Sequence, residues 1–170
     1  MKCAVIGRGL HACETLPHHG KYEIRAALNC AIDIWMAEWL VACDPSTYRH
    51  VTGRPLDRCL WRSDLLQRDE TPPAELPKWW SWPGEWVDAA PLQPYPLTYS
   101  VETAAICLAQ AGATEIHFHG CLRPSGFLKP AFAREGRQIN ENRDRWEDEQ
   151  RCMEALKTYL ATLGVGMEVF

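Results

Sequence analysis

The sequence predicts an α/β protein, a Rossmann-like three-layer sandwich around a mainly parallel sheet of about five strands. Short, continuously apolar runs that stop at turn residues favour strands buried on both faces, which is typical of parallel sheets. Helical patterns alternate with these runs along the chain, as crossover connections require. Right-handed crossovers then predict the strand order 3-2-1-4-5, with the first strand in the centre.

Each expected strand is short and ends at a turn signal. The five segments are Lys2–Gly7, Tyr22–Leu28, Trp39–Cys43, Glu115–His119 and Val165–Val169. Glycine ends the first segment, asparagine follows the second, and Asp-Pro follows the third. Glycine and proline at these points favour a change of chain direction.

Two helices are predicted in the second half of the chain. Ser100 is a good N-cap residue, and apolar residues then repeat at helical spacing as far as Leu108. Gly112 is expected to end this helix as its C′ glycine. A longer helix is predicted from about Asn142 to Leu163, charged at its start and apolar later. Residues 31–38 leave room only for a short helix.

Composition excludes some classes of function. A chain of 170 residues fits one domain, and its net charge of −4 provides no positive field for general nucleic-acid binding. No apolar run is long enough for a membrane span, so we expect a cytoplasmic protein, in the host cytoplasm if it is phage-encoded. The eight cysteines form no CxxC pair, which favours reduced, structural thiols.

A segment rich in proline and tryptophan, at about residues 66–97, interrupts the pattern of helices and strands. We expect a single domain over residues 1–170 with this segment as an insertion that contributes one edge strand. Four tryptophans lie in it: Trp79, Trp80, Trp82 and Trp86. Because so much exposed apolar surface is unusual for a monomer, their rings are expected under the loop, in a homo-oligomer interface, or against a ligand ring.

Ligands of open parallel sheets bind beyond the carboxyl ends of the strands, where the strand order reverses. This rule selects a set of ligand-binding candidates: Gly7, Arg8, Gly9, Asn29, Ser100, Gly120 and Arg123. It also selects His11 and Asp44 as catalytic candidates, each a base for a bound substrate. A small phosphate-bearing ligand is expected, and Asp44 is a candidate to hold Mg²⁺ with a nucleotide.

Each candidate also has a plain structural explanation. The Gly7–Gly9 turn is either a phosphate cradle with Arg8 as its cation or a simple strand-to-helix turn, since Ala12 replaces the third glycine of GxGxxG. Asn29 either contacts a ribose or base or starts a turn, and Asp44 is either functional or an ordinary turn residue. No GxSxG or Walker A motif is present.

Two histidines, His117 and His119, are two positions apart on an expected strand and therefore face the same side. A metal site needs a third ligand at a recognisable spacing, and the sequence offers none. A pair of packed histidines is the preferred interpretation, and no metal site is predicted.

Three segments, AVIGRGLHACETL, YEIRAALNCA and WLVACDP, resemble the opening of Rossmann-like proteins whose first turn reads G-x-G-P-S-L. These are the 6-hydroxymethylpterin diphosphokinase-like family and the single-domain bacterial sialyltransferases. The segment SVETAAICLAQAGATEIHFHG resembles their closing helix and strand. The final segment, from Asn142 to Phe170, resembles uncharacterised tailed-phage and prophage proteins of this fold. The resemblance covers about two-thirds of the chain.

The resemblance implies a nucleotide or nucleotide-sugar above the strand ends. Asn29 matches the asparagine that contacts the nucleotide in the sialyltransferase-like members, whereas Leu10-His11 replaces Pro-Ser and Cys121-Leu122 replaces an acidic residue. Three hypotheses follow. The protein is a glycosyl- or phospho-transferase with Arg123 or Arg143 at the leaving phosphate, a non-catalytic nucleotide-binding protein, or an interaction protein that uses the tryptophan-rich insertion.

Overall fold

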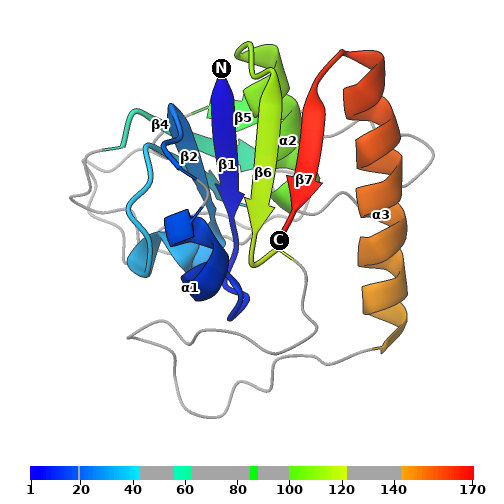
Figure 1. Ribbon diagram of the computed structural model, residues 1–170, viewed down its shortest axis with the longest axis horizontal. Helices are drawn as coiled ribbons and strands as arrows, with labels where there is room; N and C mark the ends of the chain where they lie inside the picture. The colour runs from blue at the N-terminus through cyan, green and yellow to red at the C-terminus, as the bar shows by residue number, and fades with distance from the viewer. Residues whose placement is uncertain (19, 43–55, 63–84, 88–99, 122–142) are drawn as a thin grey trace, which may run out of the picture.

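The computed structural model describes residues 1–18, 20–42, 56–62, 85–87, 100–121 and 143–170. In this part of the chain, seven parallel strands form one sheet in the order β5-β4-β3-β2-β1-β6-β7 (Figure 1). The strands are β1 (Lys2–Ile6), β2 (Ile24–Leu28), β3 (Trp39–Ala42), β4 (Arg58–Arg62), β5 (Glu85–Val87), β6 (Glu115–His119) and β7 (Gly166–Val169). The prediction of an α/β protein with a Rossmann-like parallel sheet is confirmed.

The five predicted strands are β1, β2, β3, β6 and β7, and they lie in the predicted order with β1 at the centre. The expected number of strands was too low, because β4 and β5 continue the sheet beyond β3. β4 is the short segment RCLWR, whose arginines give no clear apolar run, although Cys59 and Leu60 are buried. β5 lies inside the insertion and matches its expected edge strand.

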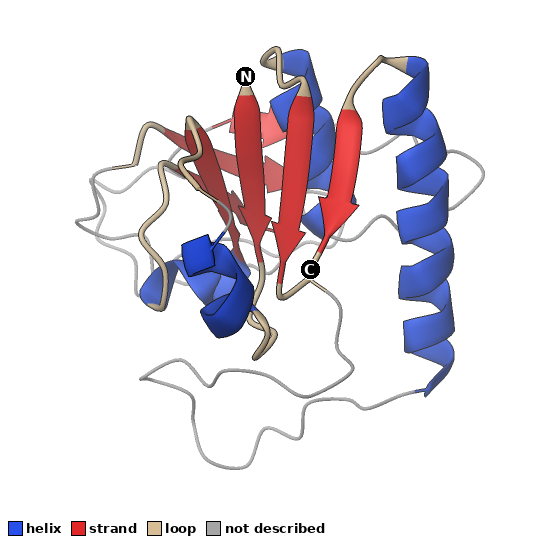
Figure 2. Cartoon of the chain, viewed as in Figure 1, coloured by secondary structure: helices blue, strands red, loops and turns tan. Residues whose placement is uncertain are grey.

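Two helices, α2 (Ser100–Gln110) and α3 (Arg143–Thr162), pack on one face of the sheet (Figure 2). Their apolar side chains join Val5, Ile116 and Phe118 in the main core. Burying a side chain of that size stabilises the fold by about 1.5–3 kcal/mol. The C′ position of α2 is Gly112, as predicted, since its φ is 97° and the Ala113 N–H donates to the Leu108 carbonyl at 3.0 Å.

The opposite face carries a smaller core and shorter helices. Here α1 (Ala12–Thr15) leads into a 3₁₀ turn at Leu16–His18, and a second 3₁₀ helix, Asn29–Asp33, replaces the short helix expected at 31–38. The apolar residues of this second cluster are Ala27, Ala31, Ile32, Leu40, Ala42 and Cys59. The sheet therefore has a helical layer on each side, and no described helix is long and apolar enough to cross a membrane.

β6 alternates between the two layers. Ile116 and Phe118 face the main core, while His117 and His119 face the other side and are 2% and 0% exposed. The two histidines therefore lie buried on one side of the strand, as the spacing predicts.

The turns after β1 and β6 approach so closely that Gly7 has no room for a side chain. A Cβ atom built on Gly7 would lie 2.3 Å from the carbonyl oxygen of Gly120. We expect Gly7→Ala to lower the free energy of unfolding by about 1–3 kcal/mol, the usual cost of overpacking. Urea unfolding followed by fluorescence measures this change.

Gly166→Ala is the matched control, because the nearest atom to its added Cβ lies at 3.7 Å. It reduces the freedom of the unfolded chain in the same way and should be neutral or slightly stabilising. Equal losses of stability in both variants would contradict the close approach of the two turns.

Candidate functional site

The sheet has its switch point between β1 and β6. From β1 the chain builds outward through β2, β3, β4 and β5, and then crosses to the other side for β6 and β7. Ligands of open α/β sheets bind at the carboxyl ends of the strands at such a point. The candidate site is therefore the set of described residues that follow β1, β2 and β6, together with the start of α2.

Main-chain hydrogen bonds join the two turns at the switch point. The Gly7 N–H donates to the His119 carbonyl and the Gly9 N–H donates to the Gly120 carbonyl, both at 2.8 Å. These two amides were candidates for binding an anion, but they donate their hydrogen bonds to carbonyl oxygens at the edge of the sheet. The close approach also explains why Gly7 and Gly120 are glycines. A role for Gly7, Gly9 and Gly120 in ligand binding stays a prediction.

Two predicted ligand-binding residues meet at the same edge. The Asn29 side-chain amide donates to the Ser100 hydroxyl oxygen at 3.3 Å, although the residues are 71 positions apart. Asn29 has a φ of 49°, a left-handed conformation that asparagine adopts more readily than most residues. The end of β2 therefore presents an amide against the first residue of α2.

The β1 turn contributes two partly exposed groups, Arg8 and His11. The His11 Nδ1 atom lies 3.7 Å from Glu14 Oε2. Both side chains are accessible near the switch point, so the turn offers a cation and an imidazole to a ligand there. The other two candidates, Asp44 and Arg123, lie outside the described residues.

Two further groups lie at this edge, of which the sequence analysis missed Glu102 and noted Cys121 only as a departure from the resembling families. Glu102, in the first turn of α2, is only 1% exposed, and Cys121 follows the β6 turn. Burial, and to a smaller extent the charge of Glu102, raise the pKa of the Cys121 thiol to about 12. The position where the resembling families have an acidic residue therefore holds a neutral thiol, whose Sγ donates to the Val5 carbonyl at 3.5 Å.

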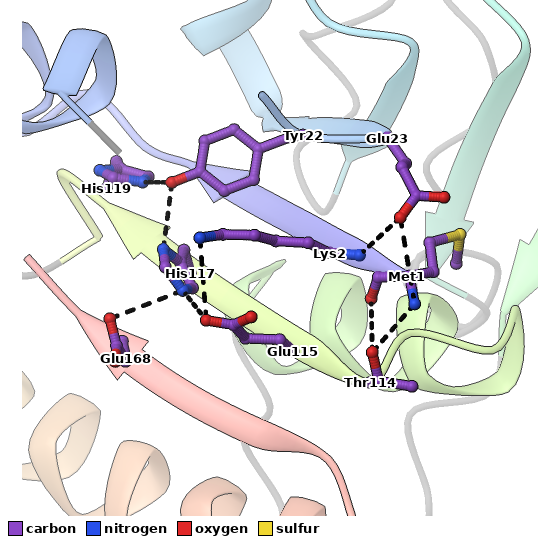
Figure 3. A network of polar contacts seen from close by, with 9 residues as sticks. All are labelled: Met1, Lys2, Tyr22, Glu23, Thr114, Glu115, His117, His119 and Glu168. Atoms are coloured by element: carbon purple, nitrogen blue, oxygen red, sulfur yellow. Dashed lines mark hydrogen bonds and ion pairs between the residues drawn. The ribbon is translucent and has the colours of Figure 1, made fainter. Parts of the chain in front are cut away.

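A second polar cluster lies beside the switch point, on the face of β6 opposite α2 and α3. Tyr22 stands between the two histidines (Figure 3). Its hydroxyl lies 2.7 Å from His119 Nε2 and 3.1 Å from His117 Nδ1. Burial, and then the charges of Glu115 and Glu168, raise the Tyr22 pKa to about 12, so its phenol is protonated at neutral pH.

Carboxylates surround the other ring nitrogen of His117. Its Nε2 atom lies 2.5 Å from Glu115 Oε1 and 3.5 Å from Glu168 Oε2. Glu168 belongs to β7 and is paired with His117 in the sheet register. The His117–Glu115 contact holds the Glu115 pKa below its ordinary value. The sequence analysis missed these partners because Glu168 approaches across the sheet, not along the strand.

A scan against family models and searches of curated proteins and of solved structures found no match to this chain. The resemblance to nucleotide-binding Rossmann-like families therefore stays a prediction beyond the fold class itself.

The cysteines of the described residues are all free, and their surroundings predict unequal reactivity. Burial raises the Cys3 pKa to about 11 and the Cys121 pKa to about 12, whereas Cys13 is exposed. Because the thiolate is the nucleophile, Cys3 and Cys121 should be almost unreactive toward iodoacetamide at pH 8, and Cys13 should be alkylated first. Peptide mass spectrometry after a timed reaction measures this order, and early labelling of Cys121 would contradict it.

The hydroxyl of Tyr22 is expected to matter for stability. Tyr22→Phe leaves His117 Nδ1 and His119 Nε2 without their shared partner, so the free energy of unfolding should fall by about 1–3 kcal/mol. Urea unfolding at pH 7 measures the loss. Tyr159→Phe, on α3, is the control for removing a phenol hydroxyl, and a larger loss in that variant would contradict the assigned network.

Proposed function

We propose that this protein binds a nucleotide or nucleotide-sugar at the carboxyl ends of β1, β2 and β6. The observation that carries the proposal is the contact between Asn29 and Ser100 at the switch point of a parallel sheet. This contact brings together two residues that the strand-end rule selected independently, from β2 and from α2. The resemblance to nucleotide-binding families supports the same ligand, since an asparagine at the position of Asn29 contacts the nucleotide in the sialyltransferase-like members.

In this proposal the phosphate groups of the ligand bind mainly to side chains, and less to the main-chain amides of the first turn. The Gly7 and Gly9 amides donate to carbonyl oxygens, so Arg8 supplies the positive charge beside them. A guanidinium binds phosphate through two parallel hydrogen bonds. The amino end of α2 adds the positive end of its helix dipole, with the Ser100 hydroxyl as a further hydrogen-bonding group. Asn29 is placed to recognise the ribose or the base.

Catalysis is a separate part of the proposal. His11 is the partly exposed base of the β1 turn, and Asp44 is the alternative base in the transferase hypothesis. A His11 imidazole that takes the proton from an acceptor hydroxyl would activate that oxygen to attack the bound ligand at the sugar carbon or at phosphorus, and the nucleotide part would leave with the electrons of the bond that breaks. Without such a base the same site binds the nucleotide and leaves it unchanged.

A thermal-shift panel tests the ligand. Nucleoside mono-, di- and triphosphates and nucleotide-sugars are added with and without Mg²⁺. A ligand at a hundredfold excess over its Kd stabilises the folded state by about 2.7 kcal/mol, which for this chain length raises the Tm by roughly 5–10 °C. No shift with any nucleotide would overturn the proposal.

Two variants locate the site. Arg8→Gln removes a charged hydrogen-bond donor and should weaken binding by about tenfold to a hundredfold. Asn29→Gly removes the amide, and its backbone keeps the φ of 49° without strain. Lys157→Gln, on the exposed side of α3, is the control for the loss of a positive charge and should leave binding unchanged. Equal binding by all three variants would contradict this location.

Product analysis by mass spectrometry separates the two forms of the proposal. Turnover that is lost in His11→Asn supports the transferase, and binding without turnover supports the non-catalytic protein.

A further inference from the structure

The directions of the hydrogen bonds around Tyr22 follow from one main-chain carbonyl. The Thr15 hydroxyl lies 2.9 Å from the His11 carbonyl oxygen and 2.8 Å from His119 Nδ1. A carbonyl oxygen can only accept, so Thr15 gives its one hydrogen to His11. Thr15 must then accept from His119, which places a hydrogen on the His119 Nδ1 atom.

The same reasoning continues across the cluster. A neutral His119 with its hydrogen on Nδ1 has an acceptor at Nε2, so the Tyr22 hydroxyl donates to it. Tyr22 has no second hydrogen and therefore accepts from His117 Nδ1. A neutral His117 then has no hydrogen on Nε2, and its lone pair points at two carboxylates.

In this tautomer a cation is favoured between His117 Nε2 and the carboxylates, because three lone-pair groups converge there. His117 is 2% exposed, and its ring is held by Tyr22 on one side and by Phe170, at a centroid distance of 5.2 Å, on another. The ring is therefore fixed, while Glu115 and Glu168 are 41% and 58% exposed and open to ions from solvent. The cation is either a proton on Nε2 or a metal ion.

We propose that Glu115, His117 and Glu168 form a binding site for a divalent transition metal ion such as Zn²⁺. Their ligand atoms lie within 4.8 Å of one another, on two adjacent strands. Zinc bound to nitrogen and oxygen at its usual distances separates tetrahedral ligands by about 3.4 Å. The 3.5 Å between His117 Nε2 and Glu168 Oε2 fits this spacing. Glu115 must withdraw its oxygen by roughly 1 Å from the ring, which a partly exposed glutamate can do.

The donor set selects the class of metal. One imidazole and two carboxylates suit Zn²⁺ and related transition ions, whereas Mg²⁺ and Ca²⁺ prefer oxygen ligands alone. The Tyr22 contact to Nδ1 is the outer-shell hydrogen bond that orients metal-binding histidines and leaves Nε2 for the metal. Three protein ligands leave a fourth position for water.

Lys2 is the competing cation in this site. Its Nζ atom lies 3.8 Å from Glu115 Oε1 and reduces the negative charge available to a metal ion. Removing this charge should therefore strengthen metal binding, a result that a purely structural ion-pair cluster would not produce.

Calorimetric titration of the whole chain with Zn²⁺, at pH 7.5 with the thiols kept reduced, tests the proposal. One site is expected to weaken more than about tenfold in both Glu115→Gln and Glu168→Gln, and to tighten in Lys2→Gln. Glu154→Gln, which removes an exposed carboxylate of α3, is the matched control and should bind as the parent does. Circular dichroism verifies that each variant is folded.

Free cysteines also bind zinc, so Co²⁺ provides the second readout. A site of nitrogen and oxygen ligands gives visible d–d bands, while thiolate ligation adds an intense near-ultraviolet charge-transfer band. Visible bands that disappear in Glu168→Gln support the proposal. Binding that shows only the thiolate band, or that is unchanged in Glu115→Gln and Glu168→Gln, would overturn it and assign the cluster to a proton-held ion pair. Because neither variant changes Arg8 or Asn29, failure here leaves the nucleotide proposal standing.

Discussion

The parallel pairing of β1 with β6 is the constraint on which both candidate sites depend. It aligns Lys2 with Glu115 at one end and Ile6 with His119 at the other. The two chain segments then stay together for a further turn, through the Gly7 and Gly9 amides and the carbonyls of His119 and Gly120. This pairing creates the switch point at the carboxyl edge. It also places the histidine face of β6 beside Lys2, so the polar cluster on β6 and the carboxyl edge proposed to bind a nucleotide share one pair of strands.

The order of the central strands follows from features that the sequence expresses locally. Continuous apolar runs, the helix between Ser100 and Gly112, and the handedness of crossovers are sufficient to predict β3-β2-β1-β6-β7. β4 is different, because its arginines interrupt the apolar pattern. In the structure Arg58 lies over the ring of Trp39, 4.6 Å from its centroid, so the charged end of the strand packs on a neighbouring aromatic side chain. A contact between two strands decides that conformation, and neither segment shows it alone.

The candidate sites likewise contain some contacts that the sequence predicts and others that it does not. The strand-end rule correctly brings Asn29 near Ser100, because parallel strands finish at one edge whatever their side chains are. It does not reveal what the amides of the first turn bind, since their acceptors lie more than 100 positions along the chain. The contact of Glu168 with His117 is equally hidden, because it depends on the register between β6 and β7. A slip of one residue would turn Glu168 to the opposite face of the sheet.

The two sites meet at α1, and this contact determines the chemistry of His117. The His11 carbonyl can only accept, and this restriction passes through Thr15, His119 and Tyr22 to the Nδ1 atom of His117. In the tautomer inferred above, the main chain of the β1 turn therefore leaves the His117 nitrogen that faces the carboxylates without a hydrogen of its own. Buried polar chains of this kind are stable only when every donor has its acceptor. The last member, the His117 Nε2 atom between two carboxylates, meets that requirement with a cation, so this chain of contacts links the turn at the proposed nucleotide edge to the proposed cation site.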